Sequence, residues 1–514
     1  MRGNKVCGIA VVVDRELVPQ NDDRATARDN ELTRMLEMIR HRGDADHFGE
    51  RGSGAGFSMG TNRLAIVDRT HAAQPLSDEA GQVWLVFSGE LYGFRDIRQE
   101  LEQLGHTFRT DSDTEVVLRS YLEWGIPFLR KLNGMFAFVI CDSRDGSFLA
   151  VRDHVGIKPL YYQLQDGVYR FASEQKCLLN HPALIRPVPP GTYVQNGEEV
   201  RYFELDEPQV STTSSAASRR YRELFEAAVR KQVDTDLPLA VPFSGGIDSA
   251  AVLQAARRYH HDVTAFTVGF EGAADVEVAR RYCEDFGVKQ HIVYLKPSDL
   301  IDIIPRIVHG AELFEVVDII DACTQFLVYQ AVRRRGIKVA ICGDGADEVL
   351  AGYDLFKTHA DPVGLMKYRV GNLHRTDLQR VDRSSMLNSV EARVPFLDRH
   401  LLEFAYSLPM DLKIRDGVEK WVLREAMRDR LPAYIVDRPK IRMPDGSGIK
   451  NVVIDHARQH VDVDDRVARG LGITSTEGAY FLDIFLKAGF PPPTERFKRP
   501  VDDYAPNGYF EFIS

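Results

Sequence analysis

A glycine-rich loop that directly follows a short apolar run carries the clearest chemical signal in the chain. Residues 239–243 are apolar, and Ser244-Gly245-Gly246-Ile247-Asp248-Ser249 follows them, immediately before a helical pattern. Glycines let the backbone approach an anion, serine hydroxyls donate hydrogen bonds, and the first N–H groups of a helix attract phosphate. Asp248 adds a carboxylate of the kind that holds Mg²⁺ on a phosphate. The loop therefore predicts a site for the phosphates of a nucleotide.

Two other kinds of nucleotide loop are excluded. The chain contains neither the Gly-Lys dipeptide that a Walker P-loop requires nor a G-x-G-x-x-G dinucleotide fingerprint. A plain Gly-rich turn with an Asp or Ser helix cap is the competing interpretation of residues 244–249. A second Gly-rich acidic segment, 343–348, follows the apolar run 339–342, and such a segment taken alone is often a solvated turn.

The elements that must position these loops alternate between strand and helix. Apolar runs at 239–243, 263–270, 291–295 and 339–342 predict strands, and helical patterns lie at 250–258, 276–286, 299–308 and 320–335. Such alternation is typical of a parallel, doubly wound α/β sheet. Ligands of these sheets bind beyond the carboxyl ends of the strands, so we expect chemistry in the loops after Phe243, Phe270 and Cys342. Beyond Asp382 the chain is predicted to be mainly helical.

The N-terminal part has many short apolar runs and few helical patterns, so it is predicted to be rich in strands. Short β-branched or aromatic runs lie at 6–13, 83–88, 135–141, 147–151 and 169–172, with helical patterns at 30–39 and 114–124. Residues 204–218 lose all periodicity and are rich in Ser and Thr, which is typical of a linker. We therefore expect a domain at 1–205, a linker at 206–218 and a second domain at 219–514.

The composition excludes several classes of protein. Of the 514 residues, 44% are hydrophobic and 27% are charged, as in ordinary globular chains. A formal net charge of -10 argues against a polyanion binder, so we expect no nucleic-acid partner. No apolar run approaches the ~20 residues of a membrane helix, so we expect no membrane partner. The six cysteines are far apart, which suggests neither a disulfide framework nor a zinc site and favours a cytoplasmic location: Cys7, Cys141, Cys177, Cys283, Cys323 and Cys342.

Several motifs in a fixed order resemble one enzyme family. The S-G-G-I-D-S loop is similar to the pyrophosphate loop of N-type ATP pyrophosphatases, and G-D-G-A-D-E at 343–348 with Gly352-Tyr353 resembles an asparagine synthetase motif. Further matches are 390–398, Lys420 with 423–425, and 438–440 with 445–446. Over nearly its whole length the chain resembles the glutamine-dependent asparagine synthetase family. The resemblance implies an N-terminal α/β/β/α sandwich of the Ntn-hydrolase type and a doubly wound ATP pyrophosphatase domain with a helical C-terminal region.

The resemblance implies that ATP activates a carboxylate as an acyl-adenylate, which ammonia converts to an amide. Asp248 and Asp347 would hold Mg²⁺ on the leaving pyrophosphate, and Lys440 occupies the position of the family's catalytic lysine. Asp344 occupies the position of a carboxylate that orients the incoming amine or takes its proton. The remaining positions of the implied ATP site are Phe243, Ser244, Gly245, Gly246, Ser249, Val268, Cys342 and Gly343.

The same family carries a glutaminase whose nucleophile is a cysteine at the start of the mature chain. Cys7-Gly8-Ile9 resembles that start. The cysteine's own α-amino group serves as the base in this mechanism, and an amide nitrogen cannot replace it. We therefore expect Met1–Val6 to be absent from the working enzyme, with Val6 read from a GTG start codon and then removed. The competing interpretation is that Cys7 is a buried strand cysteine without a chemical role.

Other residues of the N-terminal part correspond individually to positions of the family's glutaminase site. Arg63 matches the arginine that holds the glutamine carboxylate, and Asp113 matches the carboxylate that receives the α-ammonium group. Ser88-Gly89-Glu90 corresponds to the family's N-G-E, so Ser88 replaces an asparagine that donates to the oxyanion. His41-Arg42-Gly43 matches H-R-G, but the next residues, Asp44-Ala45-Asp46, depart from the family. Ile66, Val67 and Glu90 complete the implied glutamine site.

One position of the implied acyl pocket departs from the family. Relatives that make asparagine carry an arginine in the segment corresponding to 318–324, and the aligned residue here is Asp321. A like charge would weaken a pocket for dianionic aspartate, so the substrate is expected to be another carboxylic acid, one bearing an amine being an option. The alternatives are that Asp321 points to solvent or that the alignment slips by one residue. Glu391 is the second expected residue of this pocket.

Three functions stay open at this point. The first is a glutamine-dependent amidotransferase that makes asparagine or a related amide, with glutamine, ATP and a small carboxylic acid as its partners and a homodimer as the implied assembly. The second is a relative of β-lactam-forming synthetases with an inert N-terminal domain, which Asp344 disfavours because those ligases have tyrosine there. The third is a non-catalytic sensor of ATP or glutamine, against which the intact set of Asp248, Asp347 and Lys440 argues.

Overall fold

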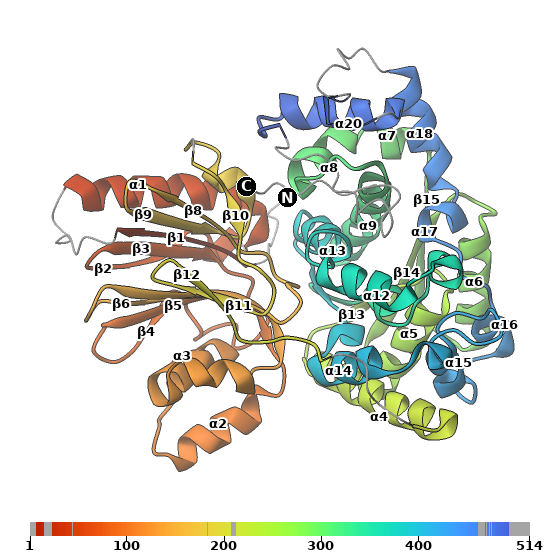
Figure 1. Ribbon diagram of the computed structural model, residues 1–514, viewed down its shortest axis with the longest axis horizontal. Helices are drawn as coiled ribbons and strands as arrows, with labels where there is room; N and C mark the ends of the chain where they lie inside the picture. Colours follow the sequence, from red (N-terminus) through yellow and green to blue (C-terminus); the bar gives the residue numbers. More distant parts are fainter. Residues whose placement is uncertain are drawn as a thin grey trace. The chain divides into compact units, whose positions relative to one another are not determined.

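The chain folds into two compact units and passes from the first to the second between Glu204 and Leu205 (Figure 1). The computed structural model describes residues 7–14, 23–43, 45–181, 183–206, 212–460, 468, 470–471, 473 and 475–492. The segment Met1–Val6 and Asp44, on which two expectations depend, lie outside the described residues. Helix α4 begins at Ser214, inside the segment expected to be a linker.

The first unit contains two six-stranded antiparallel sheets, with strand orders β10-β8-β9-β1-β3-β2 and β12-β11-β7-β6-β5-β4. Helix α1 covers one sheet, and helices α2 and α3 pack against the other. The layer order is therefore helix, sheet, sheet, helix, which confirms the α/β/β/α sandwich. The elements are β1 (Gly8–Asp14), α1 (Asp23–Met38), β2 (Glu50–Gly54), β3 (Phe57–Asn62), β4 (Leu76–Ser77), β5 (Val83–Leu91), α2 (Phe94–Gln103), α3 (Asp113–Trp124), β6 (Gly134–Asp142), β7 (Ser147–Arg152), β8 (Tyr161–Gln165), β9 (Val168–Ala172), β10 (Arg186–Pro187), β11 (Thr192–Gln195) and β12 (Glu198–Arg201).

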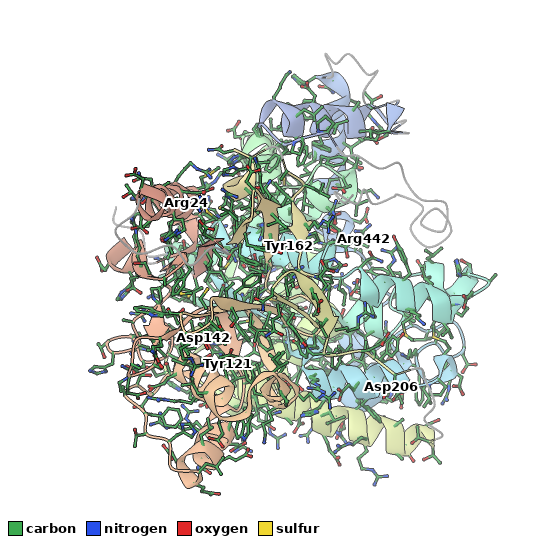
Figure 2. All side chains as sticks on the ribbon, turned by 60° about the vertical axis from the view of Figure 1, so that its left-hand side comes forward. Arg24, Tyr121, Asp142, Tyr162, Asp206 and Arg442 are labelled. Carbon is green, nitrogen blue, oxygen red and sulfur yellow. The ribbon has the colours of Figure 1, made fainter. Side chains whose placement is uncertain are left out.

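Side chains that alternate in direction along the strands form apolar layers between the two sheets and between each sheet and its helices. In β1, Ile9, Val11 and Val13 face the core between the two sheets, whereas Ala10 and Val12 pack under α1. Successive side chains of a strand point to opposite faces, so a strand buried on both sides must be apolar throughout. Tyr121 lies on α3, on the helical side of the other sheet (Figure 2). Its ring packs edge-on against that of Phe128, with ring centroids 6.2 Å apart.

The second unit is built on a five-stranded, fully parallel sheet with the order β15-β14-β13-β16-β17. From β13 the chain moves through β14 to β15 on one side and then returns to place β16 on the other side of β13, so the strand order reverses between β13 and β16. Nearly every residue of β13, β14 and β16 is buried, as a sheet covered by helices on both faces requires. Crossovers between parallel strands are almost always right-handed, so this strand order implies α5 and α6 on one face of the sheet and α9 on the opposite face.

Helices dominate the rest of this unit. The described elements are α4 (Ser214–Gln232), β13 (Leu239–Pro242), α5 (Ile247–Tyr259), β14 (Val263–Gly269), α6 (Ala274–Asp285), β15 (Gln290–Tyr294), α7 (Pro297–Ile301), α8 (Ile304–Ala311), α9 (Val316–Arg334), β16 (Val339–Ile341), α10 (Ala346–Val349), α11 (Leu355–Thr358), α12 (Pro362–Gly371), α13 (Asp377–Met386), β17 (Glu391–Arg393), α14 (Arg399–Ser407), α15 (Trp421–Met427), α16 (Ala433–Val436), α17 (Met443–Gly446), α18 (Ile449–Gln459) and α20 (Thr476–Lys487). The doubly wound sheet with a helical C-terminal region is thus confirmed.

Three local predictions differ from the structure. The single helix expected at 299–308 is two helices, α7 and α8, and Pro305 lies in the first turn of the second, where its missing N–H costs nothing. Helix α5 starts three residues before the expected Ala250, so Asp248 and Ser249 belong to its first turn. The region beyond Asp382 contains β17, a three-residue strand too short to show any periodicity.

Candidate active site

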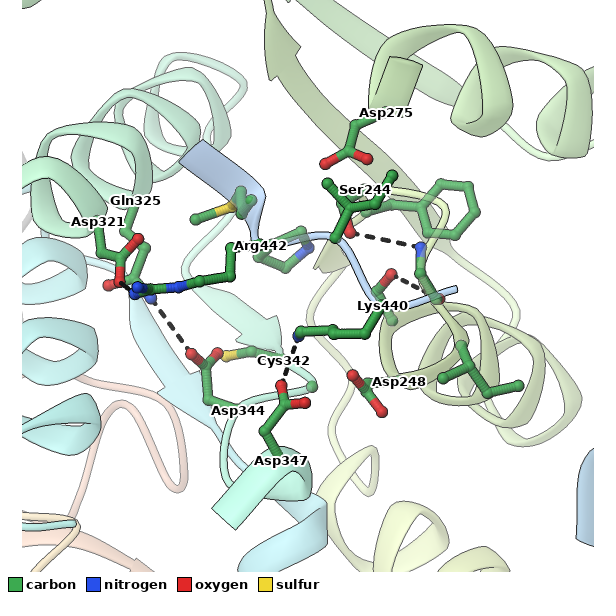
Figure 3. A pocket seen from close by; sticks show the side chains of 18 of the residues that line it. Ser244, Asp248, Asp275, Asp321, Gln325, Cys342, Asp344, Asp347, Lys440 and Arg442 are labelled. Atoms are coloured by element: carbon green, nitrogen blue, oxygen red, sulfur yellow. Dashed lines mark hydrogen bonds and ion pairs between the residues drawn. The ribbon is translucent and has the colours of Figure 1, made fainter. Parts of the chain in front are cut away.

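Two strand-end loops meet at the point where the strand order of the second unit reverses. The loop after β13 carries residues 243–246, and the loop after β16 carries 342–345. A Cβ on Gly343 would lie 3.0 Å from Asp248 Cβ, so only glycine lets the two loops approach this closely. Gly245 has a φ of +73°, and a Cβ there would lie 2.7 Å from Val278 Cγ1. The loops open into a pocket that contains most of the predicted ATP-site residues (Figure 3).

Four charged side chains form the centre of this pocket. Lys420 Nζ lies 2.6 Å from Asp347 Oδ1 and also ion-pairs with the Asp248 carboxylate. Lys440 Nζ donates to Asp347 Oδ2 at 2.5 Å (Figure 3). Asp248 comes from the first turn of α5 and Asp347 from the first turn of α10, so both carboxylates lie at helix N-termini, where negative charge is favoured. The structure therefore brings together the two predicted metal ligands and the predicted catalytic lysine.

The two lysines determine the charge state of Asp347. Burial opposes ionisation of this carboxyl, but the positive charges of Lys420 and Lys440 outweigh burial and hold its pKa below the ordinary range. The same pairing acts on Lys440, where burial would lower the pKa but Asp347 and Asp248 raise it above the usual lysine value. Both groups are therefore charged near neutral pH.

The donor set fits Mg²⁺ bound to a nucleotide. Asp248 Oδ1 is buried and has no hydrogen-bond partner, so one carboxylate oxygen faces the pocket with its bonding capacity unused. Among the described residues, no group of three or more His, Cys, Asp or Glu side chains could hold a metal. Mg²⁺ is commonly held by one or two carboxylates together with phosphate oxygens, so Asp248 and Asp347 suit an ion that arrives with ATP.

A second layer of contacts fixes the segment that carries Lys440. Arg424 donates from Nη1 to the carbonyl of Arg438 at 3.0 Å and ion-pairs through Nη2 with Glu419 Oε1 at 2.5 Å. The backbone N–H of Lys440 donates to the same Glu419 carboxylate at 3.2 Å. Arg438 in turn donates to the carbonyl of Ser244 at 3.2 Å, which links this segment to the loop after β13.

The far end of the pocket holds the predicted acyl-substrate residue Asp321. Its side chain is 7% exposed, and Arg442 Nη2 lies 2.9 Å from its Oδ2 (Figure 3). Arg380 Nη2 lies 3.6 Å from the same oxygen. The interpretation of Asp321 as a solvent-facing residue is therefore wrong.

The other expected residue of the acyl pocket lies elsewhere. Glu391 belongs to β17 and is not among the residues that line this pocket. Its Oε1 accepts from Arg393 Nε at 2.8 Å, two residues further along the same strand. Glu391 pairs in register with Val339, the first residue of β16, so it lies at the opposite end of the strand from the loop that forms the site.

Asp344 lies between the phosphate end and the acyl end of the pocket. Gln325 Nε2 donates to its Oδ1 at 3.2 Å. Burial raises the pKa of Asp344 to about 6, and the neighbouring Asp377 and Asp321 add to this effect while Arg380 opposes it. A carboxylate with a pKa near 6 is ionised at neutral pH and is a stronger base than an ordinary aspartate, as a proton acceptor requires.

In the first unit, the structure places the predicted nucleophile beside its expected neighbours. Cys7 is half-buried, and its Sγ accepts from the N–H of Leu64 at 3.0 Å. Ser88 Oγ donates to the carbonyl of Cys7 at 3.2 Å, and Arg42 Nε donates to the same carbonyl at 3.3 Å. The hydroxyl that stands where the family has an asparagine side chain is thus bonded to the nucleophile's own backbone.

The other predicted residues of the glutaminase site lie on β5, on α3 and in the loop after β3. Gly89 has a φ of +142°, and a Cβ there would lie 1.9 Å from the carbonyl oxygen of Met135, so no other residue fits. Asp113 is buried and accepts from the N–H of Leu91 at 2.9 Å. Arg63 directly precedes the residue whose N–H contacts Cys7 Sγ. The remaining predicted members, Ile66 and Glu90, are buried, and Val67 packs against the core beside α2 and α3.

Comparisons with known proteins cover both units. Residues 6–194 match the model of the glutamine amidotransferase domain, and residues 220–364 and 357–477 match that of asparagine synthase. The chain is 33% identical to asparagine synthetase [glutamine-hydrolyzing] 2 of Arabidopsis thaliana over 93% of this chain and 87% of the relative. It is 30% identical to the enzyme of Sandersonia aurantiaca over 95% and 97%. The chain belongs to the glutamine-hydrolysing asparagine synthetase family.

Two solved structures also match parts of the chain at low TM-scores. Glutamine phosphoribosylpyrophosphate amidotransferase from B. subtilis gives a TM-score of 0.32 at 16% identity over 71% of this chain and 89% of that chain. The NH3-dependent NAD synthetase from Campylobacter jejuni gives 0.25 at 14% identity over 56% and 100%.

Membership of the asparagine synthetase family gives the chain its chemistry, which is glutamine-dependent amide formation driven by ATP. Glutamine is the nitrogen source of the matched N-terminal domain, and ATP is consumed by the matched C-terminal domain. In the part of the chain that the structure describes, no helix is long and apolar enough to cross a bilayer.

Four residues of this synthetase site were not assigned a role from the sequence. Lys420 appeared only inside a quoted motif, although its φ of +53° places a non-glycine residue in the left-handed region, which is uncommon and often found at functional sites. Gln325, Arg380 and Arg442 lie on three different elements and share no local motif. Only the folded chain shows that they surround Asp321 and Asp344.

Proposed function

We propose that the second unit activates a small carboxylic acid with ATP as an acyl-adenylate and that ammonia released from glutamine converts it to an amide. Aspartate or a related acid is the substrate class. The observation that supports this proposal best is the array of Asp248, Asp347, Lys420 and Lys440 where the strand order reverses. The two competing functions, intramolecular ring closure and sensing without catalysis, are less favoured because both domain matches belong to glutamine-dependent amide synthesis.

In the first step the substrate carboxylate attacks the α-phosphorus of ATP, an acyl–phosphate bond forms and pyrophosphate leaves. Lys440 is placed to stabilise the negative charge that develops on the phosphate oxygens, because its ammonium group is held in the pocket by Asp347. Asp248 and Asp347 would hold Mg²⁺, which when bound neutralises the leaving pyrophosphate. Backbone groups of Phe243, Val268, Cys342 and Gly343 are the proposed contacts of adenine and ribose.

In the second step ammonia attacks the acyl carbon, the bond to AMP breaks and one proton must leave the nitrogen. Asp344 is the proposed acceptor of that proton. Its pKa of about 6, raised by burial, gives it more basicity than an exposed aspartate, and Gln325 fixes its carboxylate at 3.2 Å.

The proposed glutaminase uses Cys7 Sγ to attack the amide carbon of glutamine. The thioester forms, ammonia leaves, and water then releases glutamate. Ser88 and Arg42 hold the Cys7 carbonyl, and Gly89 is the proposed oxyanion-hole residue. Removal of Met1–Val6 stays a prediction, which an intact mass of the active protein tests, and a retained Val6 in active glutaminase would contradict it.

The deciding experiment measures pyrophosphate release by the full chain with ATP and Mg²⁺. Aspartate and other amino acids are added in turn, each with glutamine or with ammonium. Acid-dependent release with formation of an amide supports the proposal. Release from ammonium alone would leave the synthetase in place and remove the glutaminase role of Cys7, whereas no release with any acid would contradict the proposal. The homodimer and the cytoplasmic location stay predictions.

A further inference from the structure

The acyl end of the pocket contains two cations, and both already have carboxylate partners within the chain. Arg380 Nη1 lies 2.8 Å from Asp318 Oδ1, and its Nη2 also pairs with Asp377. Arg442 pairs with Asp321 at 2.9 Å. A substrate carboxylate that entered here would have to displace one of these internal carboxylates, which would then lie buried beside it without a partner.

The same end of the pocket offers one buried hydrogen-bond acceptor that no donor satisfies, on Gln325, beside the carboxylate of Asp321, which accepts from Arg442. Gln325 is 8% exposed and donates its amide nitrogen to Asp344, which turns its Oε1 away from that carboxylate. This buried Oε1 has no hydrogen-bond partner. A buried unpaired acceptor indicates a missing donor, which a bound ligand can supply. Asp321 Oδ2 lies on the neighbouring turn of α9, four residues before Gln325, on the same helix face (Figure 3).

The charged side chains at this end of the pocket also favour a bound cation over a second carboxylate. Three carboxylates, those of Asp318, Asp321 and Asp377, share the two arginines Arg380 and Arg442, so carboxylates outnumber arginines in this cluster. Burial is the main cause of the raised pKa of the nearby Asp344, to which Asp377 and Asp321 add and which Arg380 opposes. A cation placed between Asp321 and Gln325 would relieve the repulsion. A second carboxylate would increase it.

We propose that the acid amidated by this enzyme carries a protonated amine, bound by Asp321 and Gln325 Oε1, and has no second carboxylate. This inference rests on the proposed function and names its substrate class. The carboxylate that reacts lies beside Asp344 and the phosphate end. The amine lies on the α9 side of the pocket.

Three acids test the inference because β-alanine and succinate each differ from aspartate by one charged group. Aspartate carries an amine and a second carboxylate, β-alanine is aspartate without the second carboxylate, and succinate is aspartate without the amine. We expect the full chain, with ATP, Mg²⁺ and ammonium, to release pyrophosphate with a kcat/KM at least tenfold higher for β-alanine than for aspartate. Succinate is expected to give no release above background.

The variant Asp321→Asn separates recognition from folding. It removes the charge that binds the amine and leaves Arg442 available to a substrate carboxylate. We expect kcat/KM for β-alanine to fall at least tenfold, kcat/KM for aspartate to rise, and KM for ATP to stay unchanged. Asp302→Asn makes the same chemical change at an exposed position of the chain and is expected to leave kcat/KM unchanged for both acids. If Asp321 had a structural role alone, Asp321→Asn would change kcat/KM for both acids in the same direction.

Different failures have different meanings. Preference of the unmodified enzyme for aspartate over β-alanine, or a parallel loss for both acids in Asp321→Asn, would overturn the inference and leave the proposed function in place. If no acid caused pyrophosphate release with either nitrogen source, the result would overturn the proposed function and this inference with it.

Discussion

Replacement of Lys420 by methionine should destabilise the second unit far more than an ordinary surface substitution. Lys420 is fully buried and contacts both Asp248 and Asp347. Methionine has nearly the same length and removes only the charge. The two carboxylates would then lie in the same buried site with one cation, Lys440, in place of two.

The size of the effect follows from these contacts. Loss of one partner from a buried ion pair costs about 3–5 kcal/mol. Asp347 keeps Lys440 at 2.5 Å, so the loss falls mainly on Asp248. At about 2–4 °C per kcal/mol for a unit of this size, a loss of about 4 kcal/mol lowers Tm by about 10 °C.

The pH dependence of this loss is equally specific. In the folded chain the two lysines outweigh burial and hold the pKa of Asp347 below its ordinary value, so its contribution to stability is complete above about pH 4 and is lost as pH falls further. The stability gap between the Lys420→Met variant and the unmodified protein is therefore constant from pH 7 down to about pH 4 and narrows below about pH 4. Mg²⁺ should raise the Tm of the variant more than that of the unmodified protein, since it restores positive charge between the carboxylates.

Lys413→Met is the matched control. Lys413 is also fully buried, but the groups that accept from it include the carbonyls of Val349 and Tyr406, at 3.1 Å each. Burial lowers its pKa to about 7, so below pH 7 its protonation does not change and its stability gap should stay constant down to about pH 2. Thermal unfolding between about pH 2 and pH 7 measures both gaps. An unchanged Tm of the Lys420→Met variant would refute the electrostatic reasoning. A stability gap for this variant that stays constant with pH, as in the Lys413→Met control, would refute it as well.

Three further predictions concern activity. Lys440→Gln should lower pyrophosphate release about 100-fold, as expected when one preorganised charge is lost, while glutamate production from glutamine stays unchanged. Ser88→Ala should lower glutaminase turnover about two- to tenfold, because the lost hydrogen bond to the Cys7 carbonyl is worth about 0.5–1.5 kcal/mol, and ammonium-dependent activity is the internal control. Amide formation at constant free ammonia should fall about tenfold per pH unit below about 6, where Asp344 becomes protonated, and a pH profile of Asp344→Asn that keeps this limb would contradict its role as base.

The fold was predictable because its elements obey local rules. The alternation of apolar strands with helical patterns gave four of the five strands of the parallel sheet, and the fifth, β17, was missed because three residues show no period. In the first unit β1, β5, β6, β7 and β9 were predicted, and the other seven described strands were missed. The sequence Glu-Arg-Gly-Ser-Gly of β2, for example, has low strand propensity. Pairing of β3 with β1 and of β2 with β3 stabilises these two strands, and the partner of β3 is distant in the chain.

The phosphate end of the site was predictable for the same reason. Asp248 and Asp347 each follow a strand directly, and parallel strands end at one edge of the sheet, so strand order alone brings the carboxylates together. Lys440 required the family motif, because nothing in its neighbourhood distinguishes it from a surface lysine. Its position depends on Glu419 and Arg424, which fix the segment through backbone contacts.

The acyl end could not be predicted because its chemistry lies in pairs and not in single residues. Taken alone, Asp321 indicates only a reversed charge. Arg442, which neutralises it, is 121 positions away and stands on a loop without a motif of its own. Asp318 and Asp377 also pair with Arg380, so the carboxylates of this cluster outnumber its arginines, and Gln325 Oε1 beside them has no donor. Substrate choice in this enzyme therefore depends on which buried polar groups the fold leaves without a partner, and the three matched acids measure that property directly.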